Sequence, residues 1–288
     1  MPKASSRNNP KPNQASGFIM KFIELFAGIG GFRLGLEALG HECVFASEID
    51  KYARQTYEAN FGEKPHGDIT KIDAKDIPDH DIMTAGFPCQ DFSQAGPRKG
   101  LKGERGKLFY EIVRILQCKR PKYFILENVR GILSIDDRKV FQEICHALTD
   151  CGYQIDYKVL NSLNHGVAQK RFRVYIVGKR DANIFWHHQW PVKDGISRCV
   201  ADIMHEYRGE PVDKKYFISK KYLDGIKKRH AEGKVAGQLL DVSKPSNTIS
   251  TSERGKAFNL IKVDNLNKGG QGNRVYSPKS PNLSLIHI

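Results

Sequence analysis

From residue 21 to about residue 180, short apolar stretches alternate with longer amphipathic ones. The apolar stretches have the length of buried strands, and the amphipathic ones repeat with helical spacing. The pattern predicts strands at residues 21–26, 43–50, 81–86, 123–128, 153–161 and 172–180, and helices at 31–40, 51–62, 107–118 and 137–152. Alternation of this kind is typical of the α/β class, with a mainly parallel sheet between two layers of helices. Ligands of such sheets bind at the carboxyl ends of the strands.

The pattern changes near residue 180, which predicts a domain boundary there. Beyond it come "FWHHQWP", runs of lysine and the turn-rich "GGQGNRVYSPKSP", with no clear alternation of strands and helices. The opening residues are polar and basic and lack the apolar segment of a secretory signal. We expect a disordered basic arm at 1–20, an α/β domain at 21–180, and a smaller, mostly irregular or β domain at 181–288.

The formal net charge of +14, with a pI of about 9.4, changes this picture by suggesting a polyanionic partner. Nucleic acid is the simplest such partner, because basic surfaces release its condensed counterions on binding. A generally basic, solvated surface is the alternative. No apolar run approaches the roughly 20 residues of a membrane span, so we expect no membrane partner.

Six cysteines are spread along the chain without a CxxC pair or a zinc-type spacing with histidine. We therefore expect no metal site, and we expect reduced thiols in a cytoplasmic protein. The adjacent histidines of "WHHQW" are better explained by hydrophobic anchoring than by a metal site.

A glycine-rich segment, "ELFAGIGG", follows the first predicted strand and opens the first predicted helix. Gly28 and Gly30 allow close approach of a ligand, but Arg33 stands where a dinucleotide-binding motif has its third glycine. Glu48, at the end of the next strand, could hold ribose hydroxyls, and Asp68 could bind an amine or an adenine edge. A tight structural turn is the alternative for the glycines alone. Together these residues favour a nucleoside-bearing cofactor.

A second set of candidates surrounds Cys89 in "GFPCQDFSQAG". This loop leaves the strand predicted at 81–86, where a thiol would be accessible beside the cofactor. Glu127 ends the next strand, while Arg171 and Arg173 share one face of an extended segment. A buried thiol, a surface glutamate and a basic pair at a sheet edge are the ordinary alternatives. Their coincidence at the strand ends of one sheet favours nucleophilic chemistry.

These motifs, in this order, closely resemble those of the DNA (cytosine-5)-methyltransferase family of bacteria and phages. The resemblance covers nearly all of residues 21–180 and is carried by "LFAGIGGFRLGLEALG", "SEID", "GDIT", "GFPCQDFSQAG", "LENVRG" and "GVAQKRFRVYIVG". It implies a Rossmann-like catalytic domain at 21–180 that uses S-adenosylmethionine, and a target-recognition domain at 181–288. It also implies methylation of a cytosine flipped out of specific duplex DNA.

The resemblance implies a role for each site residue. The Cys89 thiolate would attack C6 of cytosine while Glu127 engages N3, Arg173 would contact the base, and Arg171 would support the loop or a phosphate. Gln90, Ser93 and Gln169 would serve the substrate and the mobile loop. The implied cofactor contacts are Phe26, Gly28, Gly30, Glu48, Ile49, Asp68, Pro88 and Leu108.

Two further family motifs are not found before "SPKSPNLSLIHI", so we expect a chain truncated at its C-terminus. One alternative is the same chemistry on RNA, as in the branch that methylates tRNA. The other is a silent DNA-binding fragment, or half of a two-chain enzyme that needs a complementing chain. A restriction endonuclease of the same system is an expected partner of the DNA enzyme.

Overall fold

The computed structural model describes residues 18–88, 108–180, 188–196 and 198–203, and short stretches between 217 and 273. The chain divides into two compact units, each described by itself below. The first comprises Met1–Lys158 and Val174–His188, and the second comprises Val159–Arg173 and Gln189–Ile288. No helix in the described ranges is both long and apolar enough to cross a membrane.

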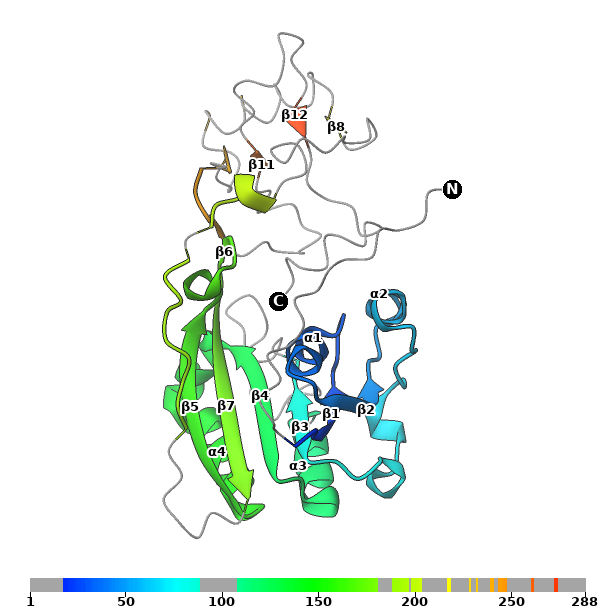
Figure 1. Cartoon of the computed structure of the whole chain (residues 1–288). Helices are drawn as coiled ribbons and strands as arrows, with labels where there is room; N and C mark the ends of the chain where they lie inside the picture. The colour runs from blue at the N-terminus through cyan, green and yellow to red at the C-terminus, as the bar shows by residue number, and fades with distance from the viewer. Residues whose placement is uncertain are drawn as a thin grey trace. The chain divides into compact units, whose positions relative to one another are not determined.

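The central element is a six-stranded sheet with the order β2-β1-β3-β4-β7-β5 (Figure 1). Its strands are β1 (Lys21–Leu25), β2 (Glu42–Ser47), β3 (Ile82–Ala85), β4 (Tyr123–Val129), β5 (Tyr153–Asn161) and β7 (Phe172–Arg180). β1 pairs in parallel with β2 and with β3, and β3 pairs in parallel with β4. β7 runs opposite to its neighbours β4 and β5, and the Arg180 amide accordingly donates to the Lys122 carbonyl at 2.9 Å.

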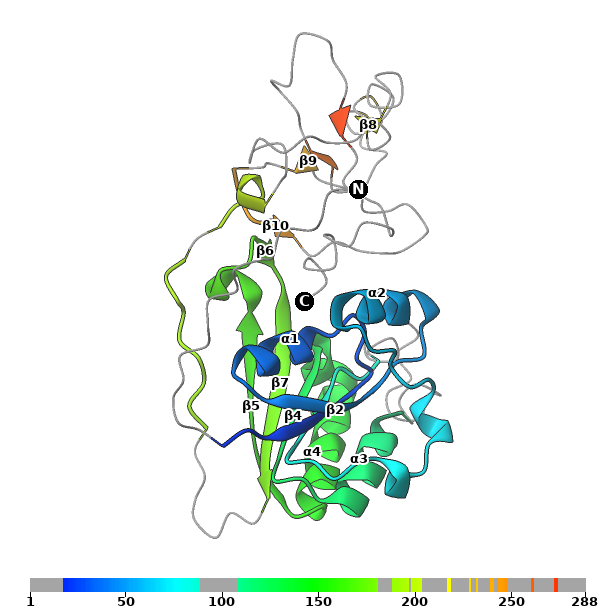
Figure 2. The same cartoon turned by 45° about the vertical axis from the view of Figure 1, so that its right-hand side comes forward.

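The helices that connect these strands are α1 (Gly31–Ala38), α2 (Lys51–Phe61), α3 (Leu108–Lys119) and α4 (Lys139–Asp150). α3 and α4 lie side by side on one face of the sheet, and α1 lies on the other (Figures 1 and 2). Right-handed connections require this, because the chain moves in opposite directions along the sheet after β1 and after β3. The predicted α/β class is confirmed.

Short 3-10 turns fill the connections near the strand ends. They are η1 (Ile69–Lys71), η2 (Ala74–Asp76), η4 (Arg130–Arg138), η5 (Ser162–His165) and η6 (Ala201–Ile203). In η4 the backbones of Asp136, Asp137 and Arg138 are left-handed, with φ of 46°, 50° and 72°. This is why α4 begins at Lys139, two residues later than the sequence pattern predicts.

Side chains from both faces of the sheet form the core. Phe22, Ile23, Leu25, Met83, Phe124 and Leu126 are fully buried. Gly178 in β7 leaves room for the Phe124 ring, whose Cε1 lies 2.1 Å from the position that a Cβ at residue 178 would take. The tight fit fixes β7 against β4.

The described strands that lie wholly in the second unit are short. They are β6 (Gln169–Lys170), β8 (Phe217–Ile218), β9 (Leu239–Leu240), β10 (Ser246–Asn247), β11 (Leu260–Ile261) and β12 (Gly272–Asn273). β6 pairs in parallel with β10, β9 pairs in parallel with β11, and β8 pairs antiparallel with β12. The segment that contains Gln169 is therefore tied to "KPSNTIST".

Candidate active site

The glycine-rich segment forms a tight loop between β1 and α1. Phe26, Gly28 and Gly30 have φ of 53°, 57° and 91°, all in the left-handed region that glycine tolerates best. A Cβ added at Gly28 would meet nothing within 4 Å. The loop thus leaves open space beside the backbone of Gly28, where a ligand could approach closely.

Glu48 closes one side of this space. Its Oε2 accepts a hydrogen bond from the Gly28 amide at 2.7 Å, and its Oε1 accepts one from the Asp50 amide at 2.8 Å. Asp50 in turn caps α2 by accepting from the amides of Tyr52 and Ala53. These bonds explain why β2 ends at Ser47 rather than at residue 50 as predicted. They also hold the carboxylate in one orientation beside the loop.

Asp68 lies close to Glu48 because the intervening chain returns to β2. The Glu48 amide donates to the His66 carbonyl at 2.9 Å, and the His66 ring stacks on Phe45 at 4.6 Å between centroids. Asp68 Oδ1 accepts from the amide and the hydroxyl of Thr70. The sequence-predicted pair of acids is therefore brought to one region of the first unit.

The structure describes three other predicted cofactor residues. Ile49, next to Glu48, exposes 69% of its surface, which is unusual for an isoleucine. Leu108 is the first residue of α3, and Pro88 follows β3. α3 is held near Asp68 by Arg114, whose Nη2 donates to the Ile69 carbonyl at 3.2 Å.

The ends of β1, β3 and β4 converge at Gly86. A Cβ built on Gly86 would lie 3.6 Å from Glu127 Oε2 and 3.9 Å from the Phe26 carbonyl oxygen. The Glu127 carboxylate therefore sits beside the chain that leads toward residue 89, on the same sheet edge as the glycine loop. The sequence placed Glu127 near the end of β4, and its place beside Cys89 stays a prediction.

Asn128, which the sequence analysis did not single out, fixes that exit from β3. Its side chain is buried, its Nδ2 donates to the Phe87 carbonyl at 3.2 Å, and its Oδ1 accepts from the Val129 amide at 2.8 Å. Phe87 itself packs against Phe109 of α3. The backbone two residues before Cys89 is thereby anchored to β4.

Cys89, Gln90 and Ser93 lie outside the described residues. Three of the described thiols are poor candidates for a nucleophile, because burial disfavours their thiolate forms. Burial raises the pKa of Cys145 to about 11, and it also raises the pKa of Cys43 and of Cys151. Such thiols hold their protons at neutral pH, and only a thiolate attacks.

Gln169, Arg171 and Arg173 belong to the second unit. Gln169 is buried, and its carbonyl accepts from the Ser162 hydroxyl at 2.7 Å. The Arg171 amide donates to Asn161 Oδ1, and the Arg171 carbonyl accepts from the Ser162 amide. Arg173 Nη1 donates to the Phe172 carbonyl at 2.8 Å. The backbone of Arg171 is thus held by Asn161 and Ser162, at the start of η5.

The sequence analysis did not predict that two charged residues, Glu24 and Arg33, are buried inside the first unit. Glu24 is 1% exposed in β1, and its Oε1 accepts from the Phe32 amide at 3.1 Å. Burial raises the pKa of Glu24 to about 8, although backbone hydrogen bonds and Arg33 oppose the change. Arg33 of α1 is 6% exposed. A charged residue within the apolar stretch "KFIELF" was the available signal for Glu24.

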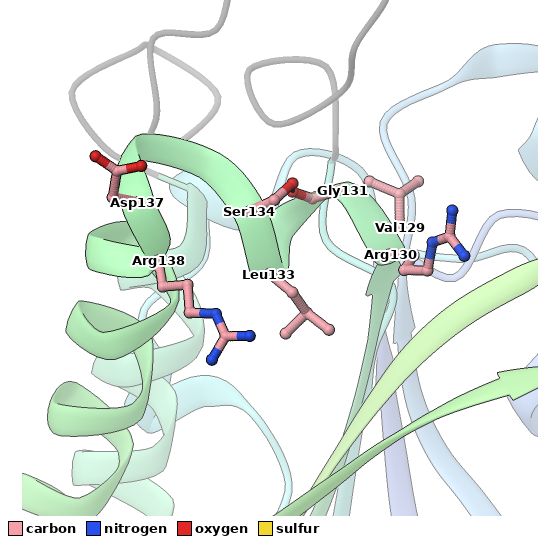
Figure 3. A pocket seen from close by; sticks show the side chains of 7 residues that line it. All are labelled: Val129, Arg130, Gly131, Leu133, Ser134, Asp137 and Arg138. Atoms are coloured by element: carbon pink, nitrogen blue, oxygen red, sulfur yellow. Dashed lines mark hydrogen bonds between the residues drawn. The ribbon is translucent and has the colours of Figure 1, made fainter.

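A cavity of about 680 Å³ opens after β4, two residues beyond Glu127. Figure 3 shows Leu133 and Arg138 pointing toward one another below the η4 turn, while Asp137 points away. The lining residues are Val129, Arg130, Gly131, Leu133, Ser134, Asp137 and Arg138. Because this lining carries both signs of charge, the cavity by itself indicates no class of ligand.

Known proteins resemble the chain over most of its length. It is 36% identical over 278 residues to the Type II methyltransferase M.HhaI of Haemophilus parahaemolyticus, covering 96% of this chain and 76% of that protein. It is 53% identical over 171 residues to M.BsuFI of Bacillus subtilis, covering 59% of this chain and 42% of that protein. For M.NgoBI of Neisseria gonorrhoeae the identity is 50% over 199 residues, covering 69% of this chain and 61% of that protein. The chain thus spans less than two thirds of two of these three relatives.

Solved structures support the same fold. The Dnmt2 methyltransferase of S. pombe superposes with a TM-score of 0.64 at 22% identity, covering 86% of this chain and 78% of that one. The Entamoeba histolytica methyltransferase EhMeth gives a TM-score of 0.65 at 19% identity, covering 86% and 74%. The model of the family described as C-5 cytosine-specific DNA methylase matches residues 20–280. With this match along nearly its whole length, the chain belongs to the C-5 cytosine-specific DNA methylase family.

Proposed function

We propose that the chain transfers a methyl group from S-adenosylmethionine to C5 of a cytosine flipped out of duplex DNA. The observation that carries the proposal is the convergence at Gly86. Glu127 Oε2 and the Phe26 carbonyl both lie within 4 Å of its Cβ position, and Cys89 follows three residues later. The Glu127 carboxyl group and the proposed nucleoside-binding loop thus share one sheet edge, and Cys89 follows that edge in the sequence.

The glycine loop fits the cofactor. The open space at Gly28 admits a ligand against the backbone, and the fixed Glu48 carboxylate can accept hydrogen bonds from the ribose hydroxyls. Exposed Ile49 offers an apolar surface to the adenine ring, and Asp68 can accept from its amine. Phe26, Pro88 and Leu108 complete the proposed pocket. When bound, S-adenosylmethionine supplies an electrophilic methyl group.

The chain's own residues make C5 of cytosine reactive. The Cys89 thiolate adds to C6, forming an S–C6 bond, and the displaced π electrons make C5 a nucleophile. Glu127, in its protonated form, stabilises this species by donating to N3. After C5 has been methylated, a base removes the C5 proton, the C5=C6 bond re-forms, and Cys89 leaves as the thiolate. Extrusion of the base is required because a stacked cytosine offers no access to C6.

We assign supporting roles to the other polar residues. Arg173 contacts the extruded base, and Arg171 supports the loop or binds a phosphate. Gln90 and Ser93 contribute to the loop that closes over the base, and Gln169 supports the substrate side. Residues 181–288 carry the recognition of the DNA sequence. The net charge of +14 favours a polyanionic substrate.

The relatives named above are Type II methyltransferases, which favours DNA over RNA as the substrate. The chain would then act beside a cognate restriction endonuclease, with a complementing chain as a further possible partner. The alternative is cytosine-5 methylation of tRNA. Incubation with tritiated S-adenosylmethionine and either duplex DNA or tRNA separates the two. Label on tRNA alone would refute the DNA assignment.

A trapping experiment tests the covalent step. Duplex DNA with 5-fluorocytosine at the target should form a stable adduct, because fluorine cannot leave C5 as a proton does. Cys89→Ser should abolish the adduct, and Glu127→Gln should lower methylation steeply in a folded protein. Cys118→Ser is the matched control, since Cys118 is an exposed thiol on α3. Near-full activity of Cys89→Ser would refute the covalent mechanism.

A further inference from the structure

Arg33, on the first turns of α1, is a charged side chain held in the interior. Its Nε donates to Glu37 Oε1 at 2.6 Å, and its Nη1 donates to Glu63 Oε2 at 2.8 Å and to the Tyr57 hydroxyl at 3.2 Å. Arginine is rarely buried without such partners. Burial lowers the pKa of Arg33, but the hydrogen bonds that it donates to Glu63, Tyr57 and Glu37 outweigh burial and raise the pKa overall. The guanidinium is therefore a fixed cation between α1 and α2.

The guanidinium also stacks on an aromatic ring that touches the glycine loop. Arg33 Cζ lies 4.5 Å from the centroid of the Phe61 ring, a distance typical of a cation–π contact. Phe61 also packs against Gly30, because a Cβ on Gly30 would lie 2.1 Å from Phe61 Cε2. Phe61 therefore contacts both Arg33 and the glycine loop.

The end of α2 holds the loop at a second point. Asn60 Nδ2 donates to the Ile29 carbonyl at 3.2 Å. Glu63 follows Gly62, the residue that ends α2 with a φ of 73°. A loop with several left-handed residues keeps its shape only when its surroundings determine it. For the glycine loop, this shape is determined by contacts with the last turn of α2, which Arg33 in turn contacts.

We propose that Arg33 is a positioning residue for the cofactor. Arg33 packs on Phe61, which contacts Gly30, and it also links α1 to the end of α2. In this way it holds the glycine loop in the shape in which the Gly28 amide donates to the Glu48 carboxylate at 2.7 Å. Arg33 itself does not touch the cofactor in this role. The inference rests on the proposed function, because it explains the contacts of Arg33 by their effect on the proposed cofactor pocket.

The test compares wild type with Arg33→Met, Arg33→Lys and Glu63→Gln in the full chain. Titration calorimetry with S-adenosylhomocysteine measures the cofactor Kd, and initial rates with duplex DNA give KM for S-adenosylmethionine and kcat. Arg33→Met should raise Kd and KM roughly tenfold while kcat at saturation changes less than about threefold, because the lost bonds act on the loop and not on the reacting atoms. Arg33→Lys keeps the charge without the planar fork, so it should recover part of the affinity.

Lys119→Met is the matched control. Lys119 is a largely covered cation on α3, with Nζ 3.2 Å from Asp79 and 3.0 Å from the Lys75 carbonyl. Its loss should lower the melting temperature without changing the cofactor Kd. Glu63 is 64% exposed, so Glu63→Gln keeps the fold even if Arg33→Met does not, and it should raise Kd about twofold.

Unchanged cofactor Kd in both Arg33→Lys and Glu63→Gln, or in a folded Arg33→Met, overturns the inference. Equal losses of affinity in Arg33→Met and Lys119→Met would also overturn it, since they would reflect stability alone. A wild-type chain that binds neither S-adenosylmethionine nor S-adenosylhomocysteine would instead refute the proposed function, and this inference with it.

Discussion

Replacing Glu24 by Gln should change the pH dependence of stability in a defined direction. Glu24 is 1% exposed in the middle of β1, and within the described residues its Oε2 has no hydrogen-bond partner. Oε1 accepts from the Phe32 amide at the start of α1. A glutamine keeps that acceptor and, like a protonated glutamic acid, carries no charge. The substitution therefore removes only the ionisation.

The magnitude follows from the pKa. Burial raises the pKa of Glu24 from 4.5 to about 8 in the folded chain. Between these values the unfolded chain has lost the proton while the folded chain keeps it, so stability falls as pH rises. At about 1.4 kcal/mol per pH unit, the full difference is at most about 5 kcal/mol, a large part of a typical folding free energy.

Urea unfolding of the full chain at pH 5, 6, 7 and 8, followed by circular dichroism, measures the effect. Wild type and Glu24→Gln should be similarly stable near pH 5, and the variant should gain stability relative to wild type at each step toward pH 8. Glu42→Gln, which removes an exposed carboxylate from the neighbouring strand, should run parallel to wild type. If the Glu24→Gln profile is also parallel within about 1 kcal/mol, the buried acid does not titrate as described.

Three further predictions concern the loop and the sheet. Gly30→Ala should destabilise the chain by about 2 kcal/mol or more in urea unfolding, because its backbone is left-handed and its Cβ would clash with Phe61. Gly28→Ala has the left-handed backbone without a clash and should cost only about 1 kcal/mol, so equal losses would contradict the role of the clash. Glu48→Ala should raise the cofactor Kd about tenfold in calorimetry, and an unchanged Kd would remove Glu48 from the pocket. Gly178→Ala should lower stability by about 1 to 3 kcal/mol through overpacking between β4 and β7, and a stability equal to wild type would show that the neighbouring ring can yield.

The sheet and its helices could be predicted because their apolar spacing is local. The strands expected at 153–161 and 172–180 have those bounds in the structure, and the helix expected at 51–62 is α2, Lys51–Phe61. The glycine loop and Glu48 were also predictable, since each follows a strand that ends at one sheet edge. The loop between β3 and α3, which contains Cys89, lies outside the described residues, so its prediction stays a prediction.

The interior charges could not be predicted in the same way. In and just after α1, Leu34 and Leu39 are 43% and 72% exposed while Arg33 is buried, which is the reverse of what their polarity suggests. Arginine is usually exposed, so the burial of Arg33 could not be predicted without knowing its partners. One of them, Glu63, is thirty residues away in the sequence. Asn128 escaped notice for the same reason, because its partner Phe87 follows β3 and lies 41 residues away in the sequence.

If Glu48 binds the cofactor as proposed, the orientation of its side chain has a consequence for selectivity among nucleotides. Both oxygens already receive a backbone amide, so the carboxylate is fixed before any ligand arrives and little ordering remains to be done on binding. A vicinal diol can donate to such an acceptor. A phosphate on one of these ribose hydroxyls would instead be repelled by the Glu48 carboxylate, whose orientation is fixed. A nucleotide phosphorylated on that hydroxyl should therefore not bind.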